Sequence, residues 1–227
     1  MTRMGLVCSS GGAVFGSAFS ILKSCGYDLG VSVVTDRSCG IESICAELDI
    51  PFLRIDDPDR ETFSTKAAEW LYDVQKVGWA TLFFSRLVGR TLYSRGPCVN
   101  FHPSLLPAFP GMGALKNTLN SGVKFFGVTA HLADRSMDGG KIMAQVAAPV
   151  PPDAKLEQLE RISFAQKVYL LLVMCELAES KQIGLDDASK ACSNDILHTC
   201  YSNPSLRNPI IAKAFMDFVN KESIPWP

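Results

Sequence analysis

The stretch 4–25 reads MGLVCSSGGAVFGSAFSILKSC, and the order of its residue types decides the class of fold. Residues 4–8 are a short apolar run that ends at two serines and two glycines. The segment from Val14 to Cys25 then carries apolar residues at roughly helical spacing. This order predicts a strand, a loop and a helix, which is how an α/β fold begins.

The same alternation continues to about residue 150. Strands are predicted at 29–35, 52–55, 80–85 and 98–101, and helices at 41–48 and 60–77. Two further strand-like runs, 126–133 and 141–150, flank the turn-rich segment 134–140 and would extend the sheet. Strands rich in Val, Leu and Phe that alternate with helices predict an α/β fold with a Rossmann-like, mainly parallel sheet flanked by helices.

Beyond residue 150 the composition becomes helical, and helices are predicted at 154–181, 186–200 and 209–221. We therefore expect a sheet domain at 1–150 and a helical C-terminal extension at 151–227, which packs on the sheet or forms an oligomer contact. The apolar run from Val168 to Leu177 is about half the length of a membrane span. It predicts a buried helix, either in the core or at the contact of a homodimer.

The composition excludes several classes of protein. In 227 residues, 47% are hydrophobic and 20% are charged, which is typical of a globular protein. The net charge of -1 argues against a nucleic-acid partner, because phosphate neutralisation needs a basic surface. Eight cysteines without a CxxC pair predict buried reduced thiols and no metal site. With neither a signal peptide nor a membrane span recognised, we expect a cytoplasmic protein.

Two segments carry candidate catalytic residues. The first, NFHPSLLP at 100–107, follows a predicted strand, and ligands of open parallel sheets bind at the carboxyl ends of strands. Asn100 and His102 alternate along that strand, so their side chains lie on the same side. The second segment, HLADRSMDGG at 131–140, contains Asp138 before two glycines, which is a turn signal. Taken singly, each segment is also compatible with a structural role.

Taken together, NFHPSLLPAFPG at 100–111 and GVTAHLADRSMDGGKIMAQ at 127–145 resemble the paired signature of the folate-dependent formyltransferases. The form is nearest to the glycinamide ribonucleotide transformylases, and the resemblance extends more weakly through LFFSRLVG at 82–89 to the N-terminal strand, loop and helix. It implies that residues 1–150 are a formyltransferase domain with the catalytic triad Asn100, His102 and Asp138. It further implies 10-formyltetrahydrofolate as the donor.

The resemblance also implies where the folate lies. In this family the pterin ring is held largely by main-chain groups of the strand before the Asn-x-His segment and of the loop that carries the aspartate. The corresponding folate-binding residues here are Arg86, Leu87, Val88, Asp134, Met137 and Gly139. The same comparison implies that the first loop, with Ser10, Gly11 and Gly12, binds the second substrate.

The chemistry of formyl transfer is consistent with this triad. An amine that attacks a formyl carbonyl creates a tetrahedral oxyanion, which the Asn100 amide and a protonated His102 can stabilise as hydrogen-bond donors. The attacking nitrogen loses a proton while the folate nitrogen gains one. Asp138, close to the imidazole, can relay that proton directly or through water. No metal ion is needed for these steps.

The sequence departs from the family on the side of the amine acceptor. The family's first loop resembles Ser-Gly-x-Gly-Ser-Asn and holds a substrate phosphate at a helix N-terminus. Here the Ser-Asn pair is replaced by Ala13 and Val14, and residues 112–115 lack the expected histidines. We hypothesise that the acceptor is a different small-molecule amine, such as an amino sugar nucleotide or an amino-acid-derived amine. The alternative is an authentic glycinamide ribonucleotide transformylase of purine synthesis.

Two functions of other classes remain open at this point. A dinucleotide-dependent dehydrogenase would explain the glycines of the first loop and Asp36 after the second strand, although Gly11, Gly12 and Gly16 do not form GxGxxG. It gives no role to Asn100 and His102. A non-catalytic binding protein on the same fold would use the altered loop and the helical tail, but it does not explain an intact triad.

Overall fold

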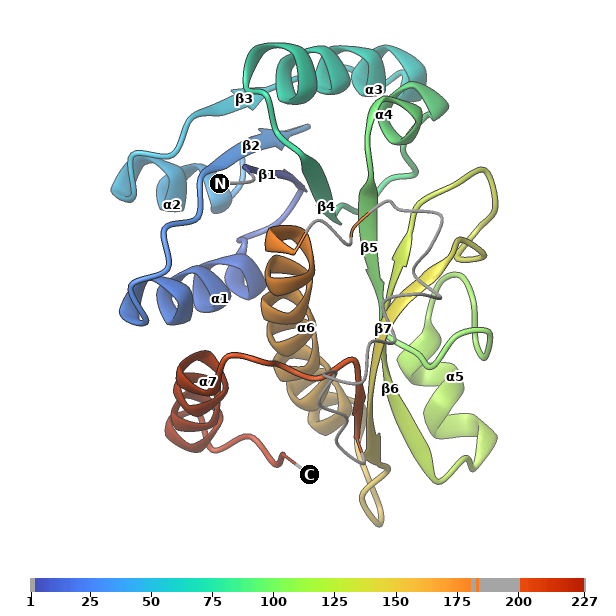
Figure 1. Cartoon of the computed structure of the whole chain (residues 1–227). Coiled ribbons are helices and arrows are strands. Elements are labelled where there is room, and N and C mark those ends of the chain that lie inside the picture. The colour runs from blue at the N-terminus through green and yellow to red at the C-terminus, as the bar shows by residue number, and fades with distance from the viewer. Residues whose placement is uncertain (1–2, 181–182, 184–200, 227) are drawn as a thin grey trace.

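The computed structural model describes residues 3–180, 183 and 201–226. Its centre is an eight-stranded sheet in the order β3-β2-β1-β4-β5-β6-β7-β8 (Figure 1). The strands are β1 (Met4–Cys8), β2 (Val31–Thr35), β3 (Phe52–Arg54), β4 (Trp79–Phe83), β5 (Cys98–His102), β6 (Phe125–Leu132), β7 (Ile142–Pro149) and β8 (Ser202–Asn203). Neighbours from β3 to β5 pair in parallel, and β6, β7 and β8 add antiparallel pairs. The prediction of a mainly parallel sheet is confirmed.

Helices cover both faces of this sheet. They are α1 (Ala13–Ser24), α2 (Ile41–Glu47), α3 (Arg60–Ala68), the π-helix η1 (Glu69–Val74), α4 (Arg90–Arg95), α5 (Ala114–Ser121), α6 (Leu156–Glu179) and α7 (Pro209–Lys221). On β1, Leu6 belongs to the apolar cluster with α1, α6 and α7, whereas Val7 belongs to the cluster with α3, η1 and α4. Neighbouring residues of one strand thus pack into apolar cores on opposite faces of the sheet, because side chains alternate along a strand.

The structure differs from the predicted elements in a few places. The helix predicted at 60–77 is α3 followed by η1, where the amide of Gln75 bonds to the carbonyl of Trp70, five residues back. This spacing is that of a π-helix and is not visible in apolar periodicity. Helices α4 and α5 and the two-residue strand β8 were not predicted: α4 and β8 are too short for a clear periodic signal, and the start of α5 depends on a left-handed Gly113.

The C-terminal segment packs directly on the sheet. Helix α6 contacts β6, β7 and α1 (Figure 1). Val168 and Leu177, which bound its apolar run, are buried in the same cluster as Leu6. A boundary near residue 150 and a homodimer stay predictions, and the helix predicted at 186–200 lies outside the described residues. Among the helices of residues 3–180 and 201–226, none is long and apolar enough to cross a membrane.

Candidate active site

The hairpin of β5 and β6 positions the candidate catalytic side chains. In their antiparallel register Asn100 lies opposite His131, and His102 lies opposite Thr129. Opposed residues of an antiparallel pair point to the same face of the sheet. The face that carries Asn100 and His102 therefore also carries His131 and Thr129, at the carboxyl end of β5.

The three residues predicted as a triad lie together on this face. His102 Nδ1 is 3.2 Å from Asp138 Oδ2, and Asn100 Nδ2 donates to Asp138 Oδ1 at 3.4 Å. The exposed fractions of the His102 and Asp138 side chains are 6% and 13%. Because water is largely excluded, the electrostatic interaction between these groups is stronger than it would be at the surface.

Asp138 is held in a tight loop. Its φ of 53° lies in the left-handed region, which aspartate tolerates better than most residues. Its Oδ2 atom also accepts a hydrogen bond of 2.7 Å from the Gly111 amide. One carboxylate thus joins the loop after β6 to the loop after β5.

Gly140 lets the chain pass close to the end of β6 before β7 begins, because a Cβ atom there would overlap the carbonyl oxygen of Leu132. We expect Gly140→Ala to displace Asp138 and to reduce both formyl transfer and the free energy of unfolding. The matched control is Gly139→Ala, which keeps the main chain proposed to bind the folate and whose Cβ would meet the Ser136 side chain, with no backbone atom closer than the Met137 carbonyl oxygen at 4.0 Å. Denaturant unfolding and activity measured for both variants test this. Equal effects of the two substitutions would contradict it.

Both ring nitrogens of His102 face oxygen atoms. Besides the contact with Asp138, Nε2 lies 2.8 Å from the carbonyl oxygen of Phe109. A carbonyl oxygen can only accept, so an imidazolium with two N–H donors satisfies both contacts. A substrate carbonyl can reach Nε2 only if the Phe109 carbonyl moves aside. Phe109 has a left-handed φ of 50°, and Gly111 follows with 78°.

The loop that carries the His-Pro segment is anchored to β6 and β7. Thr129 Oγ1 donates to the Ser104 carbonyl at 2.7 Å and accepts from the Leu106 amide at 3.0 Å. The Gln145 side chain donates to the same Oγ1 atom at 2.9 Å and to the Leu106 carbonyl at 3.0 Å. Thr129 therefore makes three hydrogen bonds, and they hold the chain that follows His102.

The segment 86–88 lies in the loop between β4 and α4. The Arg86 side chain points away, donating to the carbonyls of Asp57 at 3.0 Å and Pro58 at 2.6 Å. The Leu87 side chain is 60% exposed, whereas Val88 packs in one apolar cluster with Ala133. Val88 and Ala133 therefore pack against the same cluster, and the folate contacts of the segments 86–88 and 134–139 stay predictions.

The loop after β6 is organised by its own polar groups. Asp134 accepts from the Ser136 amide at 2.7 Å and from the Ser136 hydroxyl, and these hydrogen bonds lower the pKa of the Asp134 carboxyl. The Met137 side chain is 61% exposed, and Gly139 lies against Ser136. The predicted residues Asp134, Met137 and Gly139 thus belong to one turn that ends beside Asp138.

The first loop follows β1, and β4 lies between β1 and the catalytic strand β5. Gly12 begins α1 with a φ of 70°, and a side chain there would overlap Ile41. The Ser10 carbonyl accepts from the Ile41 amide at 3.2 Å, which fixes the loop against α2. The Ser10 hydroxyl is 3.6 Å from Cys8 Sγ, and Gly11 is exposed. Ser10, Gly11 and Gly12 therefore lie at the carboxyl edge but do not touch the triad.

Asp36, which a dehydrogenase would use to bind a ribose, is already paired. Its side chain is 2% exposed, accepts from Arg37 Nε at 2.9 Å and Nη2 at 2.7 Å, and lies 3.5 Å from Arg86. Burial raises the pKa of this carboxyl, but the hydrogen bonds and charge of Arg37 outweigh burial, and the net pKa is lowered. A carboxylate held in this way is not open to a ribose hydroxyl.

His131 is a member of the site that sequence reasoning left without a role. Its Nε2 atom lies 3.1 Å from Asn100 Nδ2 and 3.5 Å from Asp138 Oδ1, and its side chain is 3% exposed. The spacing of Thr129 and His131 on a predicted strand was the available signal, because both positions lie on one face. The sequence does not give the antiparallel register of β5 and β6, which places Thr129 opposite His102 and His131 opposite Asn100.

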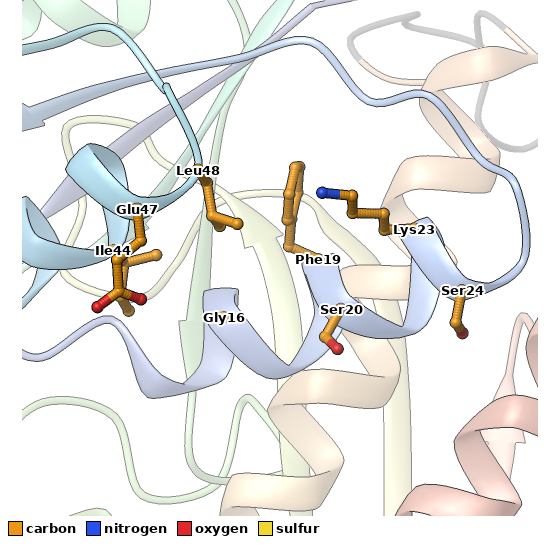
Figure 2. A pocket seen from close by; sticks show the side chains of 8 residues that line it. All are labelled: Gly16, Phe19, Ser20, Lys23, Ser24, Ile44, Glu47 and Leu48. Atoms are coloured by element: carbon orange, nitrogen blue, oxygen red, sulfur yellow. The ribbon is translucent and has the colours of Figure 1, made fainter.

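Other features of the surface and of the thiols lie apart from this site. The groove in Figure 2 runs between α1 and α2, and its lining includes Phe19 and Lys23 from α1 and Ile44 from α2. No residue that contacts Asp138 lines it. In the described part of the chain, no three His, Cys, Asp or Glu side chains are grouped to hold a metal ion, and Cys8, Cys25, Cys39, Cys45, Cys98 and Cys175 are free thiols.

The fold and site together define an enzyme of a known class. The chain belongs to the formyl transferase family, whose model matches residues 28–174. It is similar to the phosphoribosylglycinamide formyltransferase of Mycobacterium tuberculosis (strain H37Rv), with 35% identity over 156 residues, 65% of this chain and 72% of that protein. The protein of the same name from Bacillus subtilis is 41% identical over 93 residues, 40% of this chain and 47% of that protein.

Solved structures agree with this assignment. Glycinamide ribonucleotide transformylase 1 from Symbiobacterium toebii superposes with a TM-score of 0.74 at 26% identity, covering 82% of this chain and 92% of that one. The protein of the same name from Geobacillus kaustophilus gives a TM-score of 0.68 at 30% identity, covering 75% and 94%. The chain is therefore a formyltransferase of this type, and the family resemblance read from the two motifs is confirmed.

Proposed function

We propose that this protein transfers a formyl group from 10-formyltetrahydrofolate to a primary amine of a small molecule, with Asn100, His102 and Asp138 as the catalytic residues. The observation that carries the proposal is the contact of His102 Nδ1 with Asp138 Oδ2 at 3.2 Å, with Asn100 bonded to the same carboxylate. Family membership supports folate-dependent formyl transfer. The shielded Asn, His and Asp supply the hydrogen-bond donors and the proton acceptor that this reaction needs.

The residues can act in a defined order. The amine lone pair attacks the formyl carbon, a C–N bond forms, and the carbonyl electrons move onto the oxygen. His102, held by Asp138, stabilises that oxygen by donating its Nε2–H once the Phe109 carbonyl yields this position. Asp138, directly or through water, takes a proton from the attacking nitrogen and passes it to the departing folate nitrogen. The C–N bond to the folate then breaks, leaving a formamide and tetrahydrofolate.

The residues of the two flanking segments fit a folate. The folate donor supplies the formyl group. Its nitrogen gains a proton when the bond to the formyl carbon breaks. Val88 of the first segment and Ala133, which precedes the turn 134–139, pack against the same apolar cluster. Leu87 and Met137 project exposed apolar side chains that can cover a flat ring while main-chain groups bind its polar edge. The proposed folate-binding residues are Arg86, Leu87, Val88, Asp134, Met137 and Gly139.

The acceptor is proposed to be a small-molecule amine bound near Ser10, Gly11 and Gly12. Gly12 begins a 12-residue helix whose first residues, Ala13 and Val14, provide no polar side chain. Main-chain amides can still hold an anionic group there, but the side-chain donors of the family loop are absent. We favour an amino sugar nucleotide or an amino-acid-derived amine. The names of the relatives equally support the alternative, glycinamide ribonucleotide as the acceptor.

The test is release of the formyl group from 10-formyltetrahydrofolate, followed by absorbance, with a panel of amines. The panel includes glycinamide ribonucleotide, nucleotide-linked amino sugars and ornithine derivatives. We expect turnover with one of them, and its loss in His102→Ala. Efficient turnover of glycinamide ribonucleotide alone would decide for the alternative acceptor. Absence of both folate binding and turnover would decide for a non-catalytic binding protein.

A further inference from the structure

The environment of His131 determines which of its ring nitrogens carries the proton. Nδ1 lies 3.1 Å from the carbonyl oxygen of Leu132. A carbonyl oxygen only accepts hydrogen bonds, so the Nδ1 atom must be the donor in this contact. In the neutral imidazole the other nitrogen, Nε2, then carries a lone pair and can only accept.

We expect His131 to be neutral near pH 7, because its surroundings lower the pKa of the ring. Burial lowers the pKa of its imidazole, and the neighbouring His102 lowers it further. The Leu132 carbonyl, Asp138 and Asp134 raise the pKa, but by less. The net pKa lies below the ordinary value of histidine. The nearest of these charged groups is Asp138, 3.5 Å from Nε2. The ring is 3% exposed, so solvent does little to stabilise the charged form.

The neutral His131 in turn fixes the amide of Asn100. The Asn100 atom that faces Nε2 at 3.1 Å must be a donor, which identifies it as Nδ2. The second hydrogen of Nδ2 is directed to Asp138 Oδ1 at 3.4 Å. Both donors of the amide are therefore engaged by the protein. The carbonyl oxygen Oδ1 has no hydrogen-bond partner in the described part of the chain and is not a fully buried atom.

We propose that His131 is a positioning residue of the formyl-transfer reaction: by holding Nδ2 of Asn100, it turns Oδ1 toward the substrates, where this oxygen accepts a hydrogen bond from the attacking amine. This proposal rests on the proposed function and changes one part of the sequence-based expectation. Asn100 then orients the nucleophile, and His102 is left as the donor to the oxyanion. An N–H held by Oδ1 directs the nitrogen lone pair to one side, which favours attack on a formyl carbon placed there.

The first test is independent of catalysis. Nitrogen-15 NMR of the full-length protein, with His131 assigned by comparison with His131→Gln, reports the tautomer and the titration of this ring. We expect Nδ1–H with unprotonated Nε2 at pH 7, and a pKa below that of an ordinary histidine. The Nε2–H tautomer, or a charged ring at pH 7, would reverse the Asn100 amide and overturn the proposal. Because no substrate is used, this result stands whether or not the proposed function does.

The second test compares two substitutions with the amine that gives turnover. His131→Phe replaces the imidazole by an apolar aromatic ring and so removes the acceptor, and we expect kcat to fall by roughly 100-fold, the effect of a small misplacement of reacting groups. The KM for 10-formyltetrahydrofolate should stay within about twofold, since uniform binding is untouched. His131→Gln retains an amide oxygen that can accept from Asn100, and it should recover much of the lost rate. An unchanged kcat in His131→Phe would overturn the proposal.

The pH profile separates a positioning role from a purely structural one. Protonation of His131 converts Nε2 into a donor, which forces the Asn100 amide to turn over. In the wild type, kcat should therefore fall as the pH drops through the lowered pKa of His131. In His131→Gln, which does not titrate, this contribution to the acid limb should be absent. Identical acid limbs in both proteins would contradict the inference even if His131→Phe proved too unstable to assay.

Discussion

Asp138→Asn is expected to lower kcat for formyl transfer by roughly 100- to 10,000-fold, the range lost when a general acid–base group is removed. The carboxylate accepts from Asn100 Nδ2 and from the Gly111 amide, and His102 Nδ1 lies 3.2 Å from its Oδ2 atom. An amide of the same shape has one acceptor oxygen and one NH2 group, so it places a donor against at least one of these donors. It also cannot take up the proton that leaves the attacking amine.

Asp134→Asn is the matched control for this prediction. Asp134 lies in the same turn, and its hydrogen bonds are to Ser136. We expect kcat in this variant to stay within about threefold of the wild type, because the proposed folate contact of residue 134 uses its main chain, which asparagine retains, and an exposed pairing contributes little. Steady-state kinetics with the identified amine, and folate affinity by fluorescence, provide the readout. If Asp138→Asn kept wild-type kcat, Asp138 would be a turn residue and the proposed relay would be wrong.

Much of the fold could be predicted because its signals are local. The run MGLVC followed by serines and glycines predicted β1 and the start of α1, and both are present with bounds Met4–Cys8 and Ala13–Ser24. Apolar periodicity placed α7 at Pro209–Lys221, where a capping Asn208 and Pro209 mark its start. Helix α5 was missed because its start depends on Gly113 in a left-handed conformation, which is set by the loop before it.

The candidate triad could be named from two motifs, but its hydrogen bonds could not. The contact of His102 Nε2 with the Phe109 carbonyl depends on the turn at 109–111. The pairing of Asn100 with His131 depends on the antiparallel register of β5 and β6. A motif gives residue types in order, whereas the assignment of donors and acceptors needs the atoms that face each ring. Sequence reasoning gave Asn100 the role of a donor to the oxyanion, whereas we propose from these contacts that its oxygen accepts from the amine.

The identity of the amine acceptor is less well determined than the catalytic residues, because the first loop is held mainly by its main chain. The first loop is fixed by its main chain, through Gly12 against Ile41 and the Ser10 carbonyl. Such a frame can present amide N–H groups whatever the neighbouring side chains are, so it indicates an anionic substrate group but not the rest of the molecule. Ala13 and Val14 remove the side-chain donors that would narrow the choice. The amine panel is therefore the decisive measurement for this half of the reaction.

Phe215→Ala in α7 is expected to lower the free energy of unfolding by about 3–5 kcal/mol, the usual cost of removing a fully buried phenylalanine. The Phe215 side chain is 1% exposed, and its ring centroid lies 5.1 Å from Tyr169 of α6 and 4.7 Å from Trp226. The matched control is Met216→Ala on the same helix, because Met216 is 38% exposed. Denaturant unfolding followed by circular dichroism gives both values.

The same variant also tests whether the chain divides near residue 150. Phe215 and Leu6 belong to one apolar cluster, so a cavity at Phe215 should loosen the sheet as well as the tail. Hydrogen exchange in Phe215→Ala should then increase in β6 and β7 together with α7, because one cooperative unit opens as a whole. If α7 alone lost protection while β6 and β7 stayed as in the wild type, the tail would be a separate unit. The predicted division into 1–150 and 151–227 would then describe the energetics of the chain as well as its composition.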